Sequence, residues 1–350
     1  MQSRSVDPAH EKGFSLSRLR QLVRDAWHLA YPYWTSEERW VARGLLLAVV
    51  VLNLGIVFIN VLLNQWNNNF YDALQLKNYR VFLNLLIRFS WLAGMYIVFA
   101  VYGLYLNQML QIRWRRWLTD RYLRAWLAED AYYRMQLTGD LDNPDQRIEE
   151  DVPSFISGSL TLAIGGMRAV VTLISFVTIL WGLSGTLAFH VGAHPVSVPG
   201  YLVWAALLYA VAGTWLTHWI GYPLVRLNFD QQRYEADFRF SLVRFRENAE
   251  GVALYHGEPG ELRSFGQRFT HIVHNWWDIM RQQKRLTWFT AGYAQAAVIF
   301  PIIMVAPRYF SGAILLGGLM QTAGAFGQVQ DALSFVISSY TDMATWASVV

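Results

Sequence analysis

The chain has 350 residues, of which 54% are hydrophobic and only 15% are charged, and its formal net charge is +4. Soluble domains usually carry about 25% charged residues, so this composition favours an integral membrane protein. The absence of cysteine excludes disulfides and thiolate metal sites, and basic residues spread along the chain without a dense patch argue against a nucleic-acid partner.

Residues 1–40 form the first predicted part, a cytoplasmic N-terminal segment. It has no apolar core followed by a cleavage site, so we predict no signal peptide. Within it, residues 16–34 predict an amphipathic helix against the inner membrane surface, which Pro32 ends or bends. Its apolar and basic residues are Leu19, Leu22, Val23, Trp27, Arg18, Arg20 and Arg24.

Residues 41–350 predict an all-α domain with six transmembrane helices. A helix needs about 20 mostly apolar residues to cross a hydrocarbon core. Pro301 near the end of the fifth span predicts a kink. A tight hairpin at residues 307–309 separates the last two spans. The predicted spans are Val41–Leu63, Val81–Leu110, Phe155–Leu183, Tyr201–Ile220, Thr287–Ala306, and a more polar sixth from near Phe310 toward Met343.

Lysine and arginine predict the orientation of these spans, because cytoplasmic loops accumulate both residues. The segment before the first span and the two long connections are rich in them, with ten between Arg226 and Arg285 alone. The short connections hold few, and residues 190–200 hold none. Both termini and both long connections are therefore predicted to be cytoplasmic.

The two long connections predict helices that continue the spans into the cytoplasm. Apolar residues recur there at three- and four-residue steps, and a continuation of about 25 residues would reach roughly 40 Å beyond the membrane. Each pair of helices is predicted to turn at a short motif, DNPD at residues 142–145 and HGEPG at residues 256–260.

Several polar residues fall inside the predicted spans and are candidates for the lining of a translocation cavity. Buried charge in a membrane usually faces a cavity or a partner, although an arginine can also pair or reach the interface. Amides can equally form hydrogen bonds between helices, and Asp331 can lie beyond the membrane. The candidates are Asn53, Asn60, Arg88, Gln108, Arg168 and Asp331, with Asn64 and Gln111 beside them.

The two predicted turns carry charge that is either simply solvated or used to dock a cytoplasmic domain. The candidates for docking are Asp142, Asn143, Pro144, Asp145, Gln146, Arg147 and Asp151 at the first turn, and Glu250, Tyr255, Gly257 and Glu258 at the second. No catalytic residue or metal ligand is predicted. His190 and His194 have a possible spacing, but Gly192 and Pro195 disfavour a helix there and no third ligand is nearby.

Local motifs resemble the membrane domains of ABC transporters in the SbmA/BacA-related, ABCD-like group. The resemblance covers roughly residues 16–350. The motifs that carry it are NQWNNNFYDALQLKNYRVF at 64–82, IRWRRWLTDRYLRAWL at 112–127, DNPDQRIEED at 142–151, ENAEGVALYHGEPGE at 247–261, GGLMQ at 317–321 and AF at 325–326.

This resemblance implies ATP-driven transport of peptides, cobalamin or other bulky hydrophilic or amphiphilic solutes by a homodimer in a bacterial inner membrane. It implies ATP and Mg²⁺ as cofactors of the parent protein. The sequence has no G-x-x-x-x-G-K-[ST] phosphate-binding loop, so we expect a nucleotide-binding domain, fused or separate, outside these residues. Two alternatives remain: a proton-driven importer of the SbmA/BacA type, and a membrane scaffold without transport.

Overall fold

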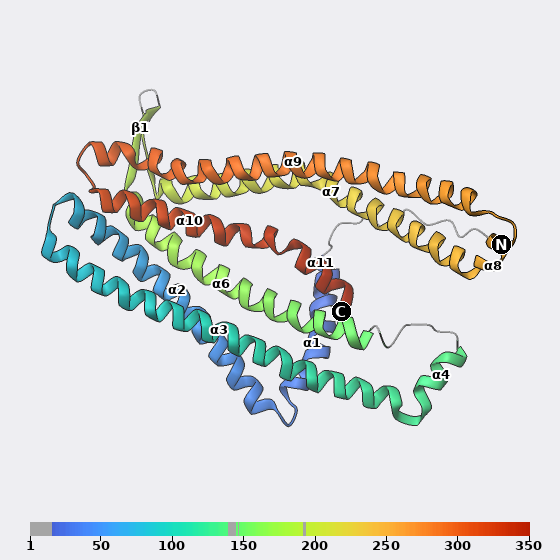
Figure 1. The fold of residues 1–350 in the computed structure, drawn as a ribbon. Coiled ribbons are helices and arrows are strands. Elements are labelled where there is room, and N and C mark those ends of the chain that lie inside the picture. The colour runs from blue at the N-terminus through green and yellow to red at the C-terminus, as the bar shows by residue number, and fades with distance from the viewer. Residues whose placement is uncertain (1–15, 139–144, 146, 192–193) are drawn as a thin grey trace. The chain divides into compact units, whose positions relative to one another are not determined.

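The computed structural model describes residues 16–138, 145, 147–191 and 194–350. These residues form helices joined by short turns, with one two-stranded hairpin, as expected for an all-α membrane domain (Figure 1). The chain divides into two compact units, the first made of Met1–Leu183 and Gly312–Val350, and the second of Ser184–Ser311.

The first unit is built from long helices joined by short connections. Its helices are α1 (Leu16–Trp34), α2 (Arg39–Gln75), α3 (Tyr79–Leu127), a 3₁₀ turn (Ala128–Asp130), α4 (Ala131–Thr138), a π-helical turn (Arg147–Asp151), α6 (Val152–Ser184), α10 (Leu316–Ser338) and α11 (Tyr340–Val349). Residues 16–34 are helical as predicted, with Pro32 inside the last turn, and their position against the membrane surface stays a prediction.

The second unit consists of one β-hairpin and two long helices with a short helix between them. Its elements are β1 (Thr186–Val191), β2 (His194–Pro199), α7 (Tyr201–Glu247), α8 (Ala249–Leu254) and α9 (Glu258–Phe310). The strands are antiparallel, with Thr186 opposite Pro199. We expected only a loop there, because two prolines and two glycines in residues 192–200 indicate turns rather than strands.

Among the described residues, five helical segments are long and apolar enough to span a membrane: Arg39–Gln75, Tyr79–Leu127, Arg147–Ser184, Tyr201–Glu247 and Glu258–Phe310. The predicted sixth span differs from its expected form. Phe310 ends α9, Gly312 makes the turn with φ of +76°, and the remainder is two helices, α10 and α11. Helix α10 carries Gln321, Gln328, Gln330 and Asp331 within its 23 residues and is not among these five segments.

The helices α7 and α9 confirm the predicted long extensions. They have 47 and 53 residues, and at 1.5 Å per residue they are roughly 70 and 80 Å long, against about 30 Å of hydrocarbon. They run antiparallel beside each other in Figure 1. The other predicted extension is interrupted. Helix α3 ends at Leu127, and Asp130 adopts a left-handed φ of +56° before α4 begins.

Polar side chains join α7 to α9 along the extensions. Asn275 Nδ2 donates to the carbonyl of Leu227 and to Gln231 Oε1, both at 2.9 Å. Nearer the start of α7, Tyr209 and Tyr293 each donate a hydroxyl hydrogen bond to the other's carbonyl, and their rings stack at 4.4 Å. Both helices are therefore held in one register.

The first unit packs α10 antiparallel on α2. Asn64 Nδ2 donates to the Gln321 carbonyl at 3.0 Å, and Asn68 Nδ2 donates to Gln321 Oε1 at 2.6 Å. At the start of α10, Asp72 Oδ1 accepts from the Gly317 amide at 2.8 Å, and Gln75 Oε1 accepts from the Leu316 amide at 2.7 Å. Side chains of α2 thus satisfy helix-end amides of α10 that have no partner within their own helix.

A buried core at the other end of this unit joins α1 to α2, α3 and α6. Tyr33 and Trp114 are almost fully buried and stack at 5.4 Å, and Phe155 meets Trp114 edge-on at 5.9 Å. Burial, with a smaller effect of the neighbouring Glu38, raises the pKa of Tyr33 to about 12. The Tyr33 hydroxyl therefore stays neutral at physiological pH. Packing of these buried side chains therefore holds α1 against the start of α6.

Candidate functional site

The second predicted turn forms an exposed tip between the end of α7 and the start of α9. The short helix α8 lies in this tip, and Tyr255, His256 and Gly257 then reverse the chain. His256 takes a left-handed φ of +50°, and the Gly257 amide donates to the Val252 carbonyl at 2.9 Å. The HGEPG motif therefore makes the turn predicted for it, with Pro259 in the first turn of α9.

This tip exposes large apolar side chains beside carboxylates. Tyr255 is 89% exposed, Leu254 73% and Leu262 72%. Glu250 and Glu258 are exposed next to them, and Glu258 lies in the first turn of α9, where the helix dipole favours a negative charge. An aromatic ring exposed among charges at the end of a rigid helix pair is suited to docking on another protein surface.

The first predicted turn is described only in part. Asp142, Asn143, Pro144 and Gln146 lie outside the described residues. Asp145 is exposed, and Arg147 Nη1 lies 3.4 Å from Asp151 Oδ2 across one helical turn. Such an exposed ion pair contributes little stability to the fold. A role of these residues in docking stays a prediction.

The candidate cavity residues are not brought together into one site. Arg88, Gln108, Arg168 and Asp331 are exposed, on α3, α3, α6 and α10 respectively. Neither arginine forms an ion pair with the described residues.

The asparagines of α2 divide between two roles. Asn53 Nδ2 donates to the Val49 carbonyl of its own helix at 2.8 Å, and Asn60 is half-buried. Asn64 is buried and bonds α10, so for this residue the interhelical explanation is confirmed. Sequence reasoning missed its partner Gln321, because nothing in the local pattern shows which helix faces it.

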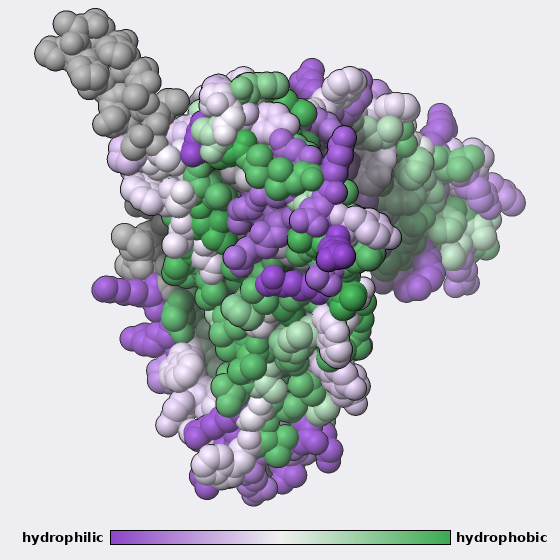
Figure 2. Space-filling view, turned by 90° about the vertical axis from the view of Figure 1, so that its left-hand side faces the viewer, coloured by the Kyte–Doolittle hydropathy of each residue, from purple (hydrophilic) through white to green (hydrophobic). Residues whose placement is uncertain are grey.

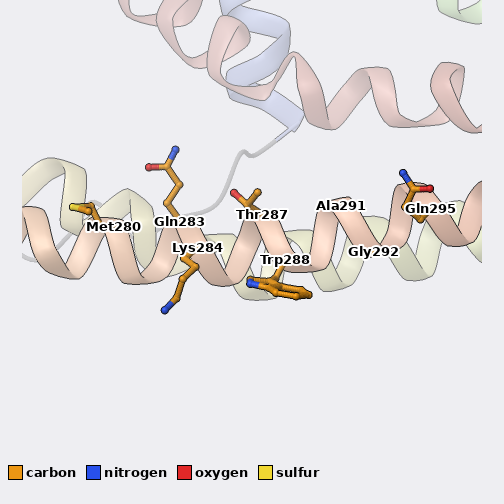
Figure 3. A pocket seen from close by; sticks show the side chains of 8 residues that line it. All are labelled: Met280, Gln283, Lys284, Thr287, Trp288, Ala291, Gly292 and Gln295. Atoms are coloured by element: carbon orange, nitrogen blue, oxygen red, sulfur yellow. The ribbon is translucent and has the colours of Figure 1, made fainter.

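Sequence reasoning also missed a polar stripe on α9. Gln283, Thr287 and Gln295 point to the same side of the helix in Figure 3, and Lys284 and Trp288 point to the other. These residues line a surface cavity of about 740 Å³ on α9. Their spacing of four and eight residues is the signal that could have revealed the stripe.

Large apolar side chains cover much of the surface of the described residues. Trp91, Leu208, Trp288 and Phe310 are each at least 70% exposed, and Figure 2 shows hydrophobic residues over much of the face it presents. Soluble monomers rarely expose such extensive apolar surface. The described residues contain no cluster of three or more His, Asp or Glu side chains suited to a metal ion.

Residues 31–310 match the family model described as ABC transporter transmembrane region 2. The chain belongs to this family. It is thus an integral membrane protein of the ABC transporter type, and the predicted family is confirmed at this level. The narrower relation to the SbmA/BacA group stays a prediction.

Relatives of this ABC transporter membrane region come from bacteria, plants and animals. The chain is 36% identical to the inner membrane ABC transporter ATP-binding protein YddA of Escherichia coli, across 95% of this chain and 60% of that protein. It is 35% identical to the chloroplastic ABC transporter D family member 2 of Arabidopsis thaliana, across 95% of this chain and 45% of that protein. It is 25% identical to the human lysosomal cobalamin transporter ABCD4, across 85% of this chain and 46% of that protein.

A solved structure supports the fold of this membrane region. A bacterial Atm1-family ABC exporter with ATP bound matches with a TM-score of 0.62 at 16% identity, over 89% of this chain and 53% of the exporter. The expected ABC exporter-type fold is therefore confirmed. The chain spans about half the length of the relatives it matches.

Proposed function

We propose that this chain is the membrane half of an ATP-driven transporter that works by alternating access. The observation that carries the proposal is the tip of α7 and α9, where Tyr255 and Leu254 stand exposed among carboxylates at the end of helices far longer than a membrane is thick. ATP and Mg²⁺ would bind a nucleotide-binding domain outside these residues, in line with relatives whose names include ATP binding.

Two copies of the chain would form the transporter. Six helices rarely enclose a wide aqueous path alone, so the path is placed between two copies. ATP binding would draw the two nucleotide-binding domains together, and the tips would pass this motion to the spans. The nucleotide must prefer one conformation, because a ligand shifts an equilibrium only through differential affinity.

The proposed substrates are peptides, cobalamin-like solutes or other bulky hydrophilic or amphiphilic molecules. Exposed Arg88, Arg168 and Gln108 and the polar stripe of α9 would offer polar contacts within otherwise apolar spans. The human relative is named a cobalamin transporter, which keeps that solute among the candidates.

Uptake into proteoliposomes tests the proposal. The full-length gene product is reconstituted, and a labelled proline- or arginine-rich peptide and labelled cobalamin are offered in parallel. We expect accumulation that requires ATP and survives a proton uncoupler. The proton-driven importer would be established by a different result. Uptake would then not require ATP, would be lost with the uncoupler, and would be abolished by Asp331→Asn. Absence of uptake with either solute, together with absence of ATP hydrolysis, would favour the scaffold. The ABC relatives favour the first outcome.

Cysteine labelling tests the proposed orientation, with both termini and both tips in the cytoplasm of a bacterial inner membrane. The chain has no native cysteine, so each introduced thiol is unique in it. Tyr255→Cys lies at the tip, and Ser311→Cys lies in the exposed turn after α9. We expect a membrane-impermeant maleimide to label Ser311→Cys in spheroplasts, and Tyr255→Cys only after permeabilisation. The reverse pattern would overturn the orientation.

A further inference from the structure

The first unit contains an apolar cavity of about 640 Å³ that no step of the proposed transport uses. Residues from six helices line it, among them Leu22 and Trp27 of α1, Trp114 of α3, Leu160 of α6, Phe335 of α10 and Trp346 of α11. None of its lining residues is charged. The Trp346 indole N–H donates to Ser159 Oγ at 2.8 Å, so even this polar pair is already satisfied.

The lining decides which class of ligand fits. Ligand sites in proteins commonly measure about 300–1,000 Å³, so this volume admits a ligand rather than a few waters. A polar solute would lose its hydrogen bonds to water and find almost none in return, which opposes its binding. A hydrocarbon chain has no hydrogen bonds to lose and matches the apolar lining. The geometry therefore favours an acyl chain.

Helix α1 supplies both the wall and the edge of this cavity. Ala26 is buried on the cavity side, whereas Val23 and Trp27 line the cavity and are still 53% and 60% exposed, which places them at its opening. An amphipathic helix with exposed Trp and Val on an integral membrane protein is suited to the boundary between headgroups and acyl chains. The opening of the cavity would therefore face lipid.

Charge beside the opening selects the headgroup. Arg20 and Arg24 are exposed, and each lies three residues before one of the two opening residues, Val23 and Trp27, which makes them neighbours on the helix surface. The Arg24 side chain is 71% exposed, and its contact with Asp25 is long, at 3.8 Å. Basic residues near a membrane surface attract the headgroups of anionic lipids.

We propose that this cavity binds one acyl chain of an anionic phospholipid, with the headgroup phosphate at Arg20 and Arg24. The bound chain fills the space between α1, α6 and α11 and so holds the C-terminal helix of the first unit against α1 (Figure 1). The proposed site binds lipid only, so its test does not depend on which solute is transported.

Photocrosslinking tests the site. The full-length gene product is reconstituted in phosphatidylcholine vesicles with a trace of phosphatidylglycerol that carries a diazirine in its acyl chain, or with a phosphatidylcholine probe of the same chain. We expect crosslinked peptides from residues 22–34, 159–163 and 343–347, with labelling by the anionic probe at least threefold above labelling by the neutral one. Equal labelling by both probes overturns the anionic assignment. Labelling spread evenly over all spans, or absent from these peptides, overturns the site.

Two variants with matched controls sharpen the test. Ala163→Phe introduces a ring at an exposed cavity residue and is expected to reduce labelling of these peptides severalfold, whereas Ala212→Phe, on an exposed face of α7, leaves it unchanged.

Replacing Arg20 and Arg24 by Gln removes the preference for the anionic probe. Replacing Arg239 and Arg246 of α7 removes the same charge from another helix and keeps the preference. An effect of the control pair equal to that of the α1 pair would overturn the headgroup site.

Discussion

Gly317→Ala is expected to lower the stability of the membrane region by about 2 kcal/mol or more. A β-carbon at this position would overlap the carbonyl oxygen of Asn68 and lie 2.5 Å from Asp72 Oδ1. Helix α10 would have to move away from α2 and lose the hydrogen bonds that its first amides donate to Asp72 and Gln75. Overpacking costs about 1–3 kcal/mol, and each lost hydrogen bond about 1 kcal/mol more.

Gly318→Ala is the matched control for this variant. At Gly318 an added β-carbon would meet only the Ile314 side chain at 3.5 Å or beyond, an ordinary contact. Both variants gain the same helix propensity, about 1 kcal/mol, so their difference isolates the clash with α2. Thermal unfolding in nanodiscs, followed by tryptophan fluorescence, measures both. Equal melting temperatures for the two variants would refute the close packing of α10 on α2.

Tyr255→Ala is expected to reduce ATP-driven uptake tenfold or more while the protein stays folded. The ring is 89% exposed at the tip, so its removal leaves no cavity in the structure. If the tip docks on a nucleotide-binding domain, this ring becomes an interface anchor, and truncating such an anchor commonly costs 2 kcal/mol or more. Uptake and ATP hydrolysis are measured on the same proteoliposomes.

Tyr79→Ala provides the control for this prediction. Tyr79 is also strongly exposed, at the start of α3, far from the tip in sequence. We expect it to keep both activities. Tyr255→Ala should retain its melting temperature and lose the stimulation of ATP hydrolysis by the transported solute. Unchanged uptake in Tyr255→Ala would remove this ring from the coupling path, even if ATP-driven transport itself were established.

Much of the helical layout could be predicted from the sequence. Apolar runs of about 20 residues placed the first five spans, and three- and four-residue periodicity placed the extensions in α7 and α9, because both signals are local properties of the chain. The HGEPG turn could also be predicted, because Gly and Pro favour turns through their own backbone preferences. The same local signals gave the amphipathic helix α1.

Local signals failed where the outcome depends on a backbone break or on a distant partner. The sequence predicted one continuous helix through residues 110–135, but α3 ends at Leu127. It predicted one sixth span, but α10 and α11 divide at Ser339. The β-hairpin was missed, since strand pairing is made between segments rather than within one.

The candidate site shows the same division. Residue types and local patterns were enough to predict which side chains can dock, pair or line a path, and to predict a turn at Tyr255 and Glu258. The contacts required the folded chain: Asn64 bonds Gln321, Asp72 caps α10, and an apolar cavity opens beside α1. The physical reason is that periodicity and turn chemistry act over a few residues, whereas a partner 257 residues away is chosen by packing.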